Sequence, residues 1–377
     1  MRINIDIKNT GIGFQIFDAL YAFKQSLTLD YSSNLDIVIN QPLMPDDCSV
    51  LWADMPSNMS VEETKKYNLV FISNRGESLM VATHRMTELI QQDNTYLIPN
   101  SFLTQDHQLF DKVITWPDSF LQCRDYWCRH FYPQYFENLR NRDQKKKWVI
   151  TAINGQNRTW RHWLFAELLS TVHNINITSN LGSSITQLND PHWASTEDTI
   201  FHEWINSRFE HTIPQPDTYY SNSKMIGIDR KFGEIPPGYF IMPEYWQSDC
   251  VLWPETTWQN NELCVTEKAC KCFYSQTIPW PVGGANIHTL YNEQGFYTAW
   301  NLLPPEHQQF DNILDHEKRY NALTCALYWA TEHPEVFYSI QAKEMLQSNQ
   351  TKFLLGSDSI VTAVTKMDKL LQQYAKQ

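Results

Sequence analysis

Two stretches of the sequence place charged residues at the predicted start of a helix, where they could bind an anion. In the first, Arg158 and Arg161 lie three residues apart near the start of an amphipathic segment that runs to about residue 172, so they can share a face. Unpaired backbone N–H groups and the macrodipole already make a helix start positive, so cations there are electrostatically unfavourable. A bound diphosphate would reverse that cost, because N–H groups, dipole and guanidinium would contact one ligand. Two solvated arginines are the alternative interpretation.

The second stretch, residues 250–284, contains Glu255, Thr266, Glu267 and Lys268. Thr266 is a residue type that can cap a helix, Glu267 suits a first turn, and Lys268 is a point charge able to meet a phosphate oxygen. The carboxylates can accept hydrogen bonds from ribose or sugar hydroxyls. Each residue also has a purely structural interpretation, as ordinary helix capping for the Thr-Glu-Lys run or as a buried tie between strand and loop for Glu255.

Three motifs of the second stretch follow one another in a set order. They are Glu255 after a predicted strand, Val265-Thr266-Glu267-Lys268 at a predicted helix start, and Pro281-Val282-Gly283-Gly284. In order and spacing they resemble the donor-site motif of the α-1,3-fucosyltransferase family and its virus-encoded relatives. The resemblance also includes Asn154 to His162, Gly295 to Thr298, Phe310 to Asn312, and Arg319, and it therefore covers residues 150 to 320 approximately.

The resemblance implies a GT-B glycosyltransferase, an α/β protein whose two Rossmann-like domains face a cleft. Arg161 and Lys268 would hold the diphosphate of a nucleotide-sugar donor, and its hydroxyl groups would bind Glu255 and Glu267. The other residues implied in donor binding are Arg158, Thr256 and Thr266. We therefore expect inverting transfer of a hexosyl or fucosyl group from a nucleoside-diphosphate sugar to a hydroxyl of a glycan or other acceptor.

A GDP-sugar is favoured by the resemblance, as a co-substrate rather than a cofactor. We expect no essential metal, because the sequence has no Asp-x-Asp run and basic side chains would replace the divalent ion. Thr256-Thr257 stand where the family has Asn-Ser, and Cys264 stands where an aromatic residue is common. These departures leave the transferred sugar open. They also favour one alternative, a catalytically silent glycan-binding or structural protein of this fold. A second alternative, which the acidic composition disfavours, is a sugar transferase acting on modified nucleic-acid bases.

A general base is expected in the N-terminal half, because inverting GT-B enzymes use a carboxylate of the acceptor domain to deprotonate the attacking hydroxyl. Asp18 follows a glycine loop, and Glu77 ends the turn-like run Asn74-Arg75-Gly76-Glu77. Of the two we favour Glu77. Solvation at the surface is the alternative for either carboxylate.

The elements that must position these residues alternate between strands and helices, which predicts mostly parallel sheets. Predicted strands are 2–7, 35–39, 49–52, 69–72, 95–98, 112–116, 148–153, 175–178, 250–253 and 277–282, and predicted helices include 14–23, 158–172, 200–209 and 266–274. The charged run at 143–147 suggests a boundary. We expect a Rossmann-like acceptor domain at 1–147, a donor domain at 148–320, and C-terminal helices at 321–377 that pack on the domains, with Leu370 and Leu371 on the last apolar face.

Composition narrows the class of partner. The net charge of -12 argues against broad contact with a nucleic-acid backbone. No stretch approaches the roughly 20 apolar residues of a membrane span, and the N-terminus lacks the apolar core of a signal peptide. We expect a cytoplasmic protein, in the host cytoplasm if it is virus-encoded. Reduced thiols are expected for the eight cysteines, because the chain is long and has no secretory features. Cys264, Cys270 and Cys272 cluster but do not form a paired zinc pattern.

Overall fold

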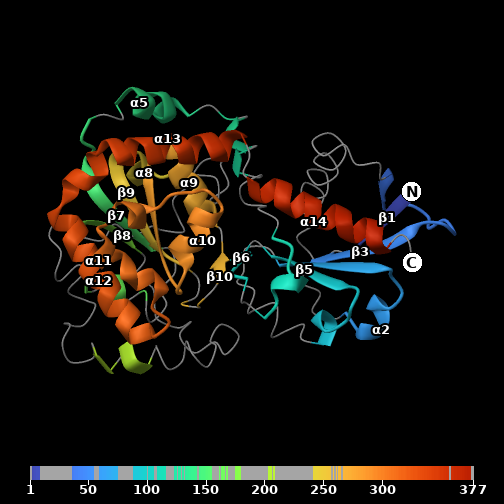
Figure 1. Ribbon diagram of the computed structural model, residues 1–377. Coiled ribbons are helices and arrows are strands. Elements are labelled where there is room, and N and C mark those ends of the chain that lie inside the picture. The colour runs from blue at the N-terminus through green and yellow to red at the C-terminus, as the bar shows by residue number, and fades with distance from the viewer. Residues whose placement is uncertain are drawn as a thin grey trace. The chain divides into compact units, whose positions relative to one another are not determined.

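The chain forms two compact units, shown in the computed structural model of Figure 1. Unit 1 comprises Met1–Gln122 and Gly356–Gln377, and unit 2 comprises Cys123–Leu355. The structure describes residues 2–8, 36–54, 59–74, 88–99, 101–105, 108–115, 123–124, 126–128, 130, 132–141, 144–154, 161, 163–165, 167–168, 175–179, 203–205, 207–208, 241–255, 258, 260, 262–264, 266–355 and 358–374.

Unit 1 is built on a five-stranded parallel sheet with the order β2-β1-β3-β4-β5. Its strands are β1 (Arg2–Lys8), β2 (Asp36–Ile39), β3 (Cys48–Asp54), β4 (Leu69–Asn74) and β5 (Thr95–Pro99). Unit 1 also contains α2 (Val61–Thr64), β6 (Ser101–Leu103) and η2 (Phe110–Lys112). The strand expected at 112–116 is wrong, because this run begins in η2 and continues as one isolated bridge between Val113 and Leu97.

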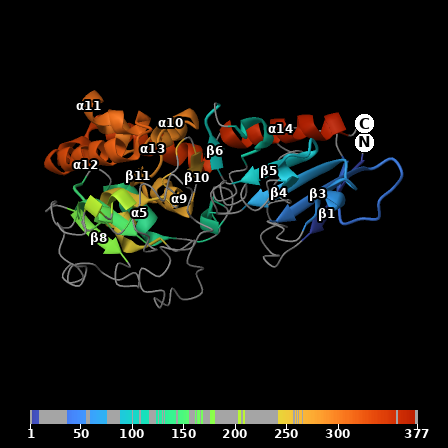
Figure 2. The ribbon, with the colours of Figure 1, turned by 90° about the horizontal axis from the view of Figure 1, so that it is seen from below.

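The last helix of the chain, α14 (Asp358–Tyr374), completes the core of unit 1. Its buried residues Met367, Leu370, Leu371 and Tyr374 belong to the same apolar cluster as Ile3, Val50 and Phe71 of the sheet. Figure 2 shows α14 lying along this sheet. The apolar face expected at Leu370 and Leu371 is confirmed, since their exposed fractions are 8% and 0%.

Unit 2 is built on a four-stranded parallel sheet with the order β11-β9-β7-β8. The strands are β7 (Trp148–Asn154), β8 (Ile175–Ser179), β9 (Ser248–Pro254) and β11 (Ile278–Val282). Every residue of β9 and β11 is buried, as expected for parallel strands covered on both faces. The first strand of the unit, β7, therefore lies between the second, β8, and the third, β9.

Helices and a short strand surround the sheet of unit 2. They are α5 (Pro133–Asn141), α8 (Pro243–Gln247), β10 (Glu262–Cys264), α9 (Glu267–Ser275), α10 (Ile287–Glu293), η4 (Ala299–Leu302), α11 (Pro305–Gln308), η5 (Gln309–Asn312), α12 (His316–Glu332), η6 (Pro334–Tyr338) and α13 (Ile340–Leu355). Tyr320 and Leu323 of α12 and Met345 of α13 join the main apolar cluster of this unit. Figure 1 shows α13 passing over α9, where Phe353 and Phe273 have ring centroids 6.2 Å apart.

The two parallel sheets with flanking helices confirm the predicted α/β class with two Rossmann-like units. The division between the units differs from the expected boundary at 147, because α5 and the residues before it belong to unit 2. Trp127, Tyr132 and Tyr135 each pack against Tyr274 of α9. The C-terminal helices are also divided, with α12 and α13 in unit 2 and α14 in unit 1. The helix expected at 14–23 lies outside the described residues.

Replacing Leu371 by alanine tests the place of α14 in unit 1. Removing this fully buried side chain should destabilise unit 1 by about 2–5 kcal/mol, the usual cost of a large-to-small change in a core. Amide hydrogen exchange of β1 and β3 should accelerate, while that of β7 and β9 stays unchanged. Gln373→Ala, at an exposed position of the same helix, is the control. Unchanged exchange in β1 and β3 would contradict the assignment.

Candidate functional site

The strand order of unit 2 marks one end of the sheet as the place for a ligand. After β7 the chain forms β8 on one side, and it later forms β9 on the other side of β7. In open parallel sheets ligands bind outside the carboxyl ends of the strands at such a switch point. Arg161 follows β7 and Glu255 follows β9, so both lie beyond the carboxyl ends of these two central strands.

Arg161 is fixed directly against the end of β9. Its Nε and one terminal nitrogen donate hydrogen bonds to the main-chain oxygen of Glu255, at 3.0 and 2.5 Å. The residue is 6% exposed and helical, and the neighbouring helical residues Leu164, Phe165 and Leu168 belong to the apolar cluster under the sheet. This burial and the two hydrogen bonds give the guanidinium a defined position at the switch point.

The carboxyl group of Glu255 is buried and only partly hydrogen-bonded. Its Oε1 accepts a bond from the indole nitrogen of Trp253 at 2.8 Å, whereas its Oε2 has no hydrogen-bond partner among the described residues. Burial raises the pKa of Glu255 to about 7, against the opposing effects of Lys268, Trp253 and Arg161. This carboxyl group can therefore exchange a proton near neutral pH, and it has an oxygen left for a ligand.

The start of α9 supplies the second basic residue. Lys268 Nζ lies 3.5 Å from Glu267 Oε1, and both side chains are partly exposed. Burial acts to raise the pKa of Glu267, but the charges of Lys268 and Lys271 outweigh it, so its pKa lies below the ordinary value. Glu267 is thus ionised at neutral pH and lies in the first turn, where the helix dipole favours a carboxylate.

Thr266 precedes α9 in the extended conformation of an N-cap, but its side chain makes no capping hydrogen bond. The expected cap by this hydroxyl is therefore wrong. Its Oγ1 is buried and has no partner among the described residues. A buried hydroxyl without a partner is costly, so a ligand that bonded to it would gain stability.

The structure brings Arg161, Glu255, Glu267 and Lys268 together, because the charges of the other three all act on the carboxyl group of Glu255. A helical residue that follows β7 and the start of α9, which are distant in the sequence, thus meet at one carboxyl group. The other candidates lie outside the described residues, and they are Asp18, Glu77, Arg158 and Thr256. Within the described residues no group of His, Cys, Asp or Glu could hold a metal ion.

Two further residues of the matching motifs make structural contacts within unit 2. Asp311 caps α10, since its carboxylate accepts the backbone N–H groups of His288 and Thr289. Arg319 is 1% exposed and donates to the main-chain oxygen of Trp258 and to the Asn260 side chain. Trp258 and Asn260 follow Glu255 closely in the chain, so Arg319 fixes the segment that follows β9. The sequence indicated both residues as motif members but did not indicate these contacts.

No protein-family model and no curated protein matches the chain. Among solved structures it is similar to an α1,3-fucosyltransferase, with 12% identity and a TM-score of 0.48 over 98% of this chain and 90% of that chain. It is also similar to the Anabaena protein HepE in complex with UDP and glucose, with 11% identity and a TM-score of 0.45 over 99% and 100%. A glycosyltransferase from Rickettsia africae has 11% identity and a TM-score of 0.42 over 100% and 99%. Similarity at this level says nothing about substrate, which has to be inferred from the residues of the site.

No helix in the described part of the chain is long and apolar enough to cross a membrane.

Glu255→Gln tests the state of the buried carboxyl group. Folded unit 2 keeps the proton on Glu255 up to a pKa of about 7, whereas the unfolded chain releases it near a pKa of about 4.3. Between these values the folded state binds more protons, so the contribution of Glu255 to the free energy of unfolding falls as pH rises from about 4.3 to about 7.

The glutamine variant lacks this dependence, so its stability relative to wild type should increase over the same pH range. Hydrogen exchange of the β7 and β9 amides at several pH values measures the difference, because it reports on unit 2 separately. A difference that stays constant with pH would show that Glu255 has an ordinary pKa.

Proposed function

We propose that the carboxyl end of the unit 2 sheet binds a nucleoside-diphosphate sugar and that the chain is a glycosyltransferase. The observation that carries this proposal is the meeting of Arg161, which follows β7, and Lys268, at the start of α9, around the carboxyl group of Glu255. A diphosphate is the ligand that would use both positive side chains together with the N–H groups at the start of α9. The resemblance of the donor-site motifs favours a GDP-sugar.

The polar groups that the diphosphate does not use suit the rest of such a donor. Glu255 Oε2 and Thr266 Oγ1 are buried without partners among the described residues, and Glu267 is an ionised carboxylate beside Lys268. A sugar or ribose carries several hydroxyl groups that can donate to the carboxylates and accept from the threonine. The roles we assign are therefore diphosphate binding for Arg161 and Lys268, and hydroxyl binding for Glu255, Thr266 and Glu267. Arg158 and Thr256 are assigned to the same site from their motif positions.

The reaction we propose is inverting transfer. An acceptor hydroxyl attacks the anomeric carbon, the bond from that carbon to the diphosphate oxygen breaks, and the diphosphate leaves with the electron pair. Glu77, or Asp18, takes the proton of the attacking hydroxyl as general base. Arg161, Lys268 and the N–H groups of α9 stabilise the charge that develops on the leaving diphosphate, which is the service a divalent ion gives in other transferases. We propose that the acceptor is a glycan or another hydroxyl compound.

Lys268→Gln tests the donor site. Loss of one charged contact with the diphosphate should weaken the binding of nucleoside diphosphates at least about tenfold, since such a hydrogen bond contributes roughly 1.5–3 kcal/mol. Isothermal titration with GDP, UDP and ADP, in the presence of a chelator, gives the affinities. Lys318→Gln is the matched control, because Lys318 is also a first-turn lysine beside an acidic residue. Equal affinities in wild type and Lys268→Gln would overturn the proposed site.

Glu77→Gln tests the general base. Removing the base should reduce sugar transfer at least about a hundredfold while donor affinity stays within about twofold of wild type, as expected for general-base catalysis. Transfer is measured from the sugar nucleotide that binds most tightly. A reduction of less than about tenfold would exclude Glu77 as the base, and Asp18→Asn would then be compared in the same way. Donor binding without turnover in the wild-type protein would instead indicate the catalytically silent alternative.

A further inference from the structure

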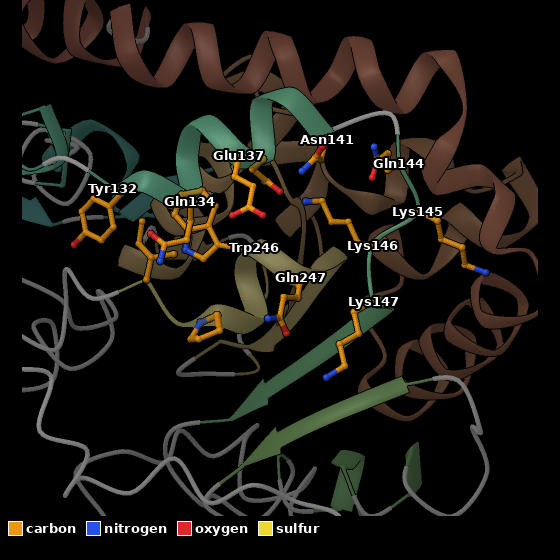
Figure 3. A pocket seen from close by; sticks show the side chains of 13 residues that line it. Tyr132, Gln134, Glu137, Asn141, Gln144, Lys145, Lys146, Lys147, Trp246 and Gln247 are labelled. Atoms are coloured by element: carbon orange, nitrogen blue, oxygen red, sulfur yellow. The ribbon is translucent and has the colours of Figure 1, made fainter.

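Unit 2 contains a pocket at the other end of its sheet from Arg161 and Glu255. The lining comes from α5, from residues 144–147, which lead into β7, and from α8, which leads into β9 (Figure 3). Because Lys147 precedes β7 and Gln247 precedes β9, the pocket lies at the amino ends of these two parallel strands. Its volume is about 720 Å³, which falls in the range of roughly 300–1,000 Å³ for small-molecule sites.

The lining combines apolar surface with a group of polar side chains that donate or accept hydrogen bonds. Five of the thirteen lining side chains are amides, and they are Gln134, Asn138, Asn141, Gln144 and Gln247. An amide carries a donor and an acceptor side by side, and among the five Asn138 already donates to the main-chain oxygen of Ser275. The carboxylate of Glu137 accepts, and lysine ammonium groups donate. A ligand with many hydroxyl groups, each of which donates and accepts, is complementary to this mixture.

Two aromatic rings with fixed positions complete the lining. Trp246 and Tyr132 are both 9% exposed, and each packs edge-on against Tyr274, with centroid distances of 6.0 and 6.1 Å. In Figure 3 Gln134 and Glu137 extend from α5 toward Trp246 of α8. A ring beside amide and carboxylate groups suits a sugar, since a pyranose has an apolar C–H face as well as hydroxyl edges.

The lysines of the pocket do not make it a simple anion site. Lys146 Nζ already donates to the main-chain oxygen of Gln276 at 3.1 Å, and it neighbours the buried Asp249. Lys147 Nζ lies over the ring of Trp148, 5.2 Å from its centroid. Figure 3 shows Lys145 pointing away from Glu137 and Trp246. The three ammonium groups therefore do not converge on one point, as binding of a phosphate would require.

We propose that this pocket binds a saccharide, at a site separate from the donor site. The inference does not depend on the proposed transferase activity, because the pocket and the residues around Glu255 lie at opposite ends of the same strands. The polar contacts come from exposed side chains, principally Gln134, Glu137 and Gln247, and the aromatic contact comes from Trp246.

An array of defined neutral oligosaccharides, containing glucose, galactose, mannose and N-acetylglucosamine chains, tests the proposal with the full-length protein. We expect wild type to retain at least one of them. The double variant Gln134→Ala/Gln247→Ala should bind that oligosaccharide at least about tenfold more weakly by isothermal titration, because two hydrogen-bonding groups are lost. Both positions are exposed, so the fold should be unaffected.

Two controls separate this pocket from other sites. Gln347→Ala/Gln373→Ala removes two exposed glutamines from α13 and α14 and should bind as wild type does. Lys268→Gln should also retain the oligosaccharide, whatever its effect on nucleotides. The proposal is overturned if wild type retains no oligosaccharide, if the pocket variant binds equally well, if Lys268→Gln abolishes binding, or if inorganic phosphate displaces the oligosaccharide.

Discussion

The described site depends on one contact, the pair of hydrogen bonds from the buried guanidinium of Arg161 to the main-chain oxygen of Glu255. It ties the helix that follows β7 to the residue that follows β9, across the two central strands of unit 2. A buried charge needs partners, and a carbonyl at the end of a strand needs a donor, so each group satisfies the other. The contact also places positive charge near the carboxyl group of Glu255 and so opposes the effect of burial on its pKa.

The opposing effects of burial and of nearby positive charge on Glu255 allow its carboxyl group to be either neutral or ionised near neutral pH. Burial favours its neutral form, whereas Lys268 and Arg161 favour its ionised form, and the resulting pKa of about 7 lies between the two extremes. An anion that bound Lys268 and Arg161 would partly neutralise both and would favour the protonated form of Glu255. A protonated carboxyl group can donate to a ligand oxygen, and an ionised one can accept from a hydroxyl.

Sequence patterns predicted most strands and the last helix because the apolar residues of those elements follow a strand or helix period within the element itself. The apolar runs of β4 and β9 and the apolar face at Leu370 and Leu371 follow from periodicity alone. No local sequence pattern marks the boundary between the units. Helix α5 belongs to unit 2 through ring contacts with Tyr274, which is far away in the sequence. The run at 112–116 has the composition of a strand but pairs through a single bridge. Here tertiary context overrides local preference.

The candidate site was predictable in part for the same reason. Arg161, Glu255 and Lys268 were assigned to the site through motif order. The absence of a capping bond from Thr266, and of a partner for Glu255 Oε2 among the described residues, depends on packing. The pocket at the opposite end of the sheet could not be predicted, because its amides come from α5, the segment before β7 and α8. None of these segments has a motif of its own, and only the fold places them together.

Helix α9 accounts for the difference in chemistry between the two ends of unit 2. Its nine residues span about 13 Å, and all residues from Ala269 to Ser275 are buried. At its start, N–H groups and Lys268 present positive charge, which suits an anion. At its end, the carbonyls of Ser275 and Gln276 accept hydrogen bonds from Asn138 and Lys146. The positive charge of Lys146 thus compensates the helix end. The neighbouring pocket keeps its other amides and its two rings for a ligand, which favours hydroxyl groups over phosphate.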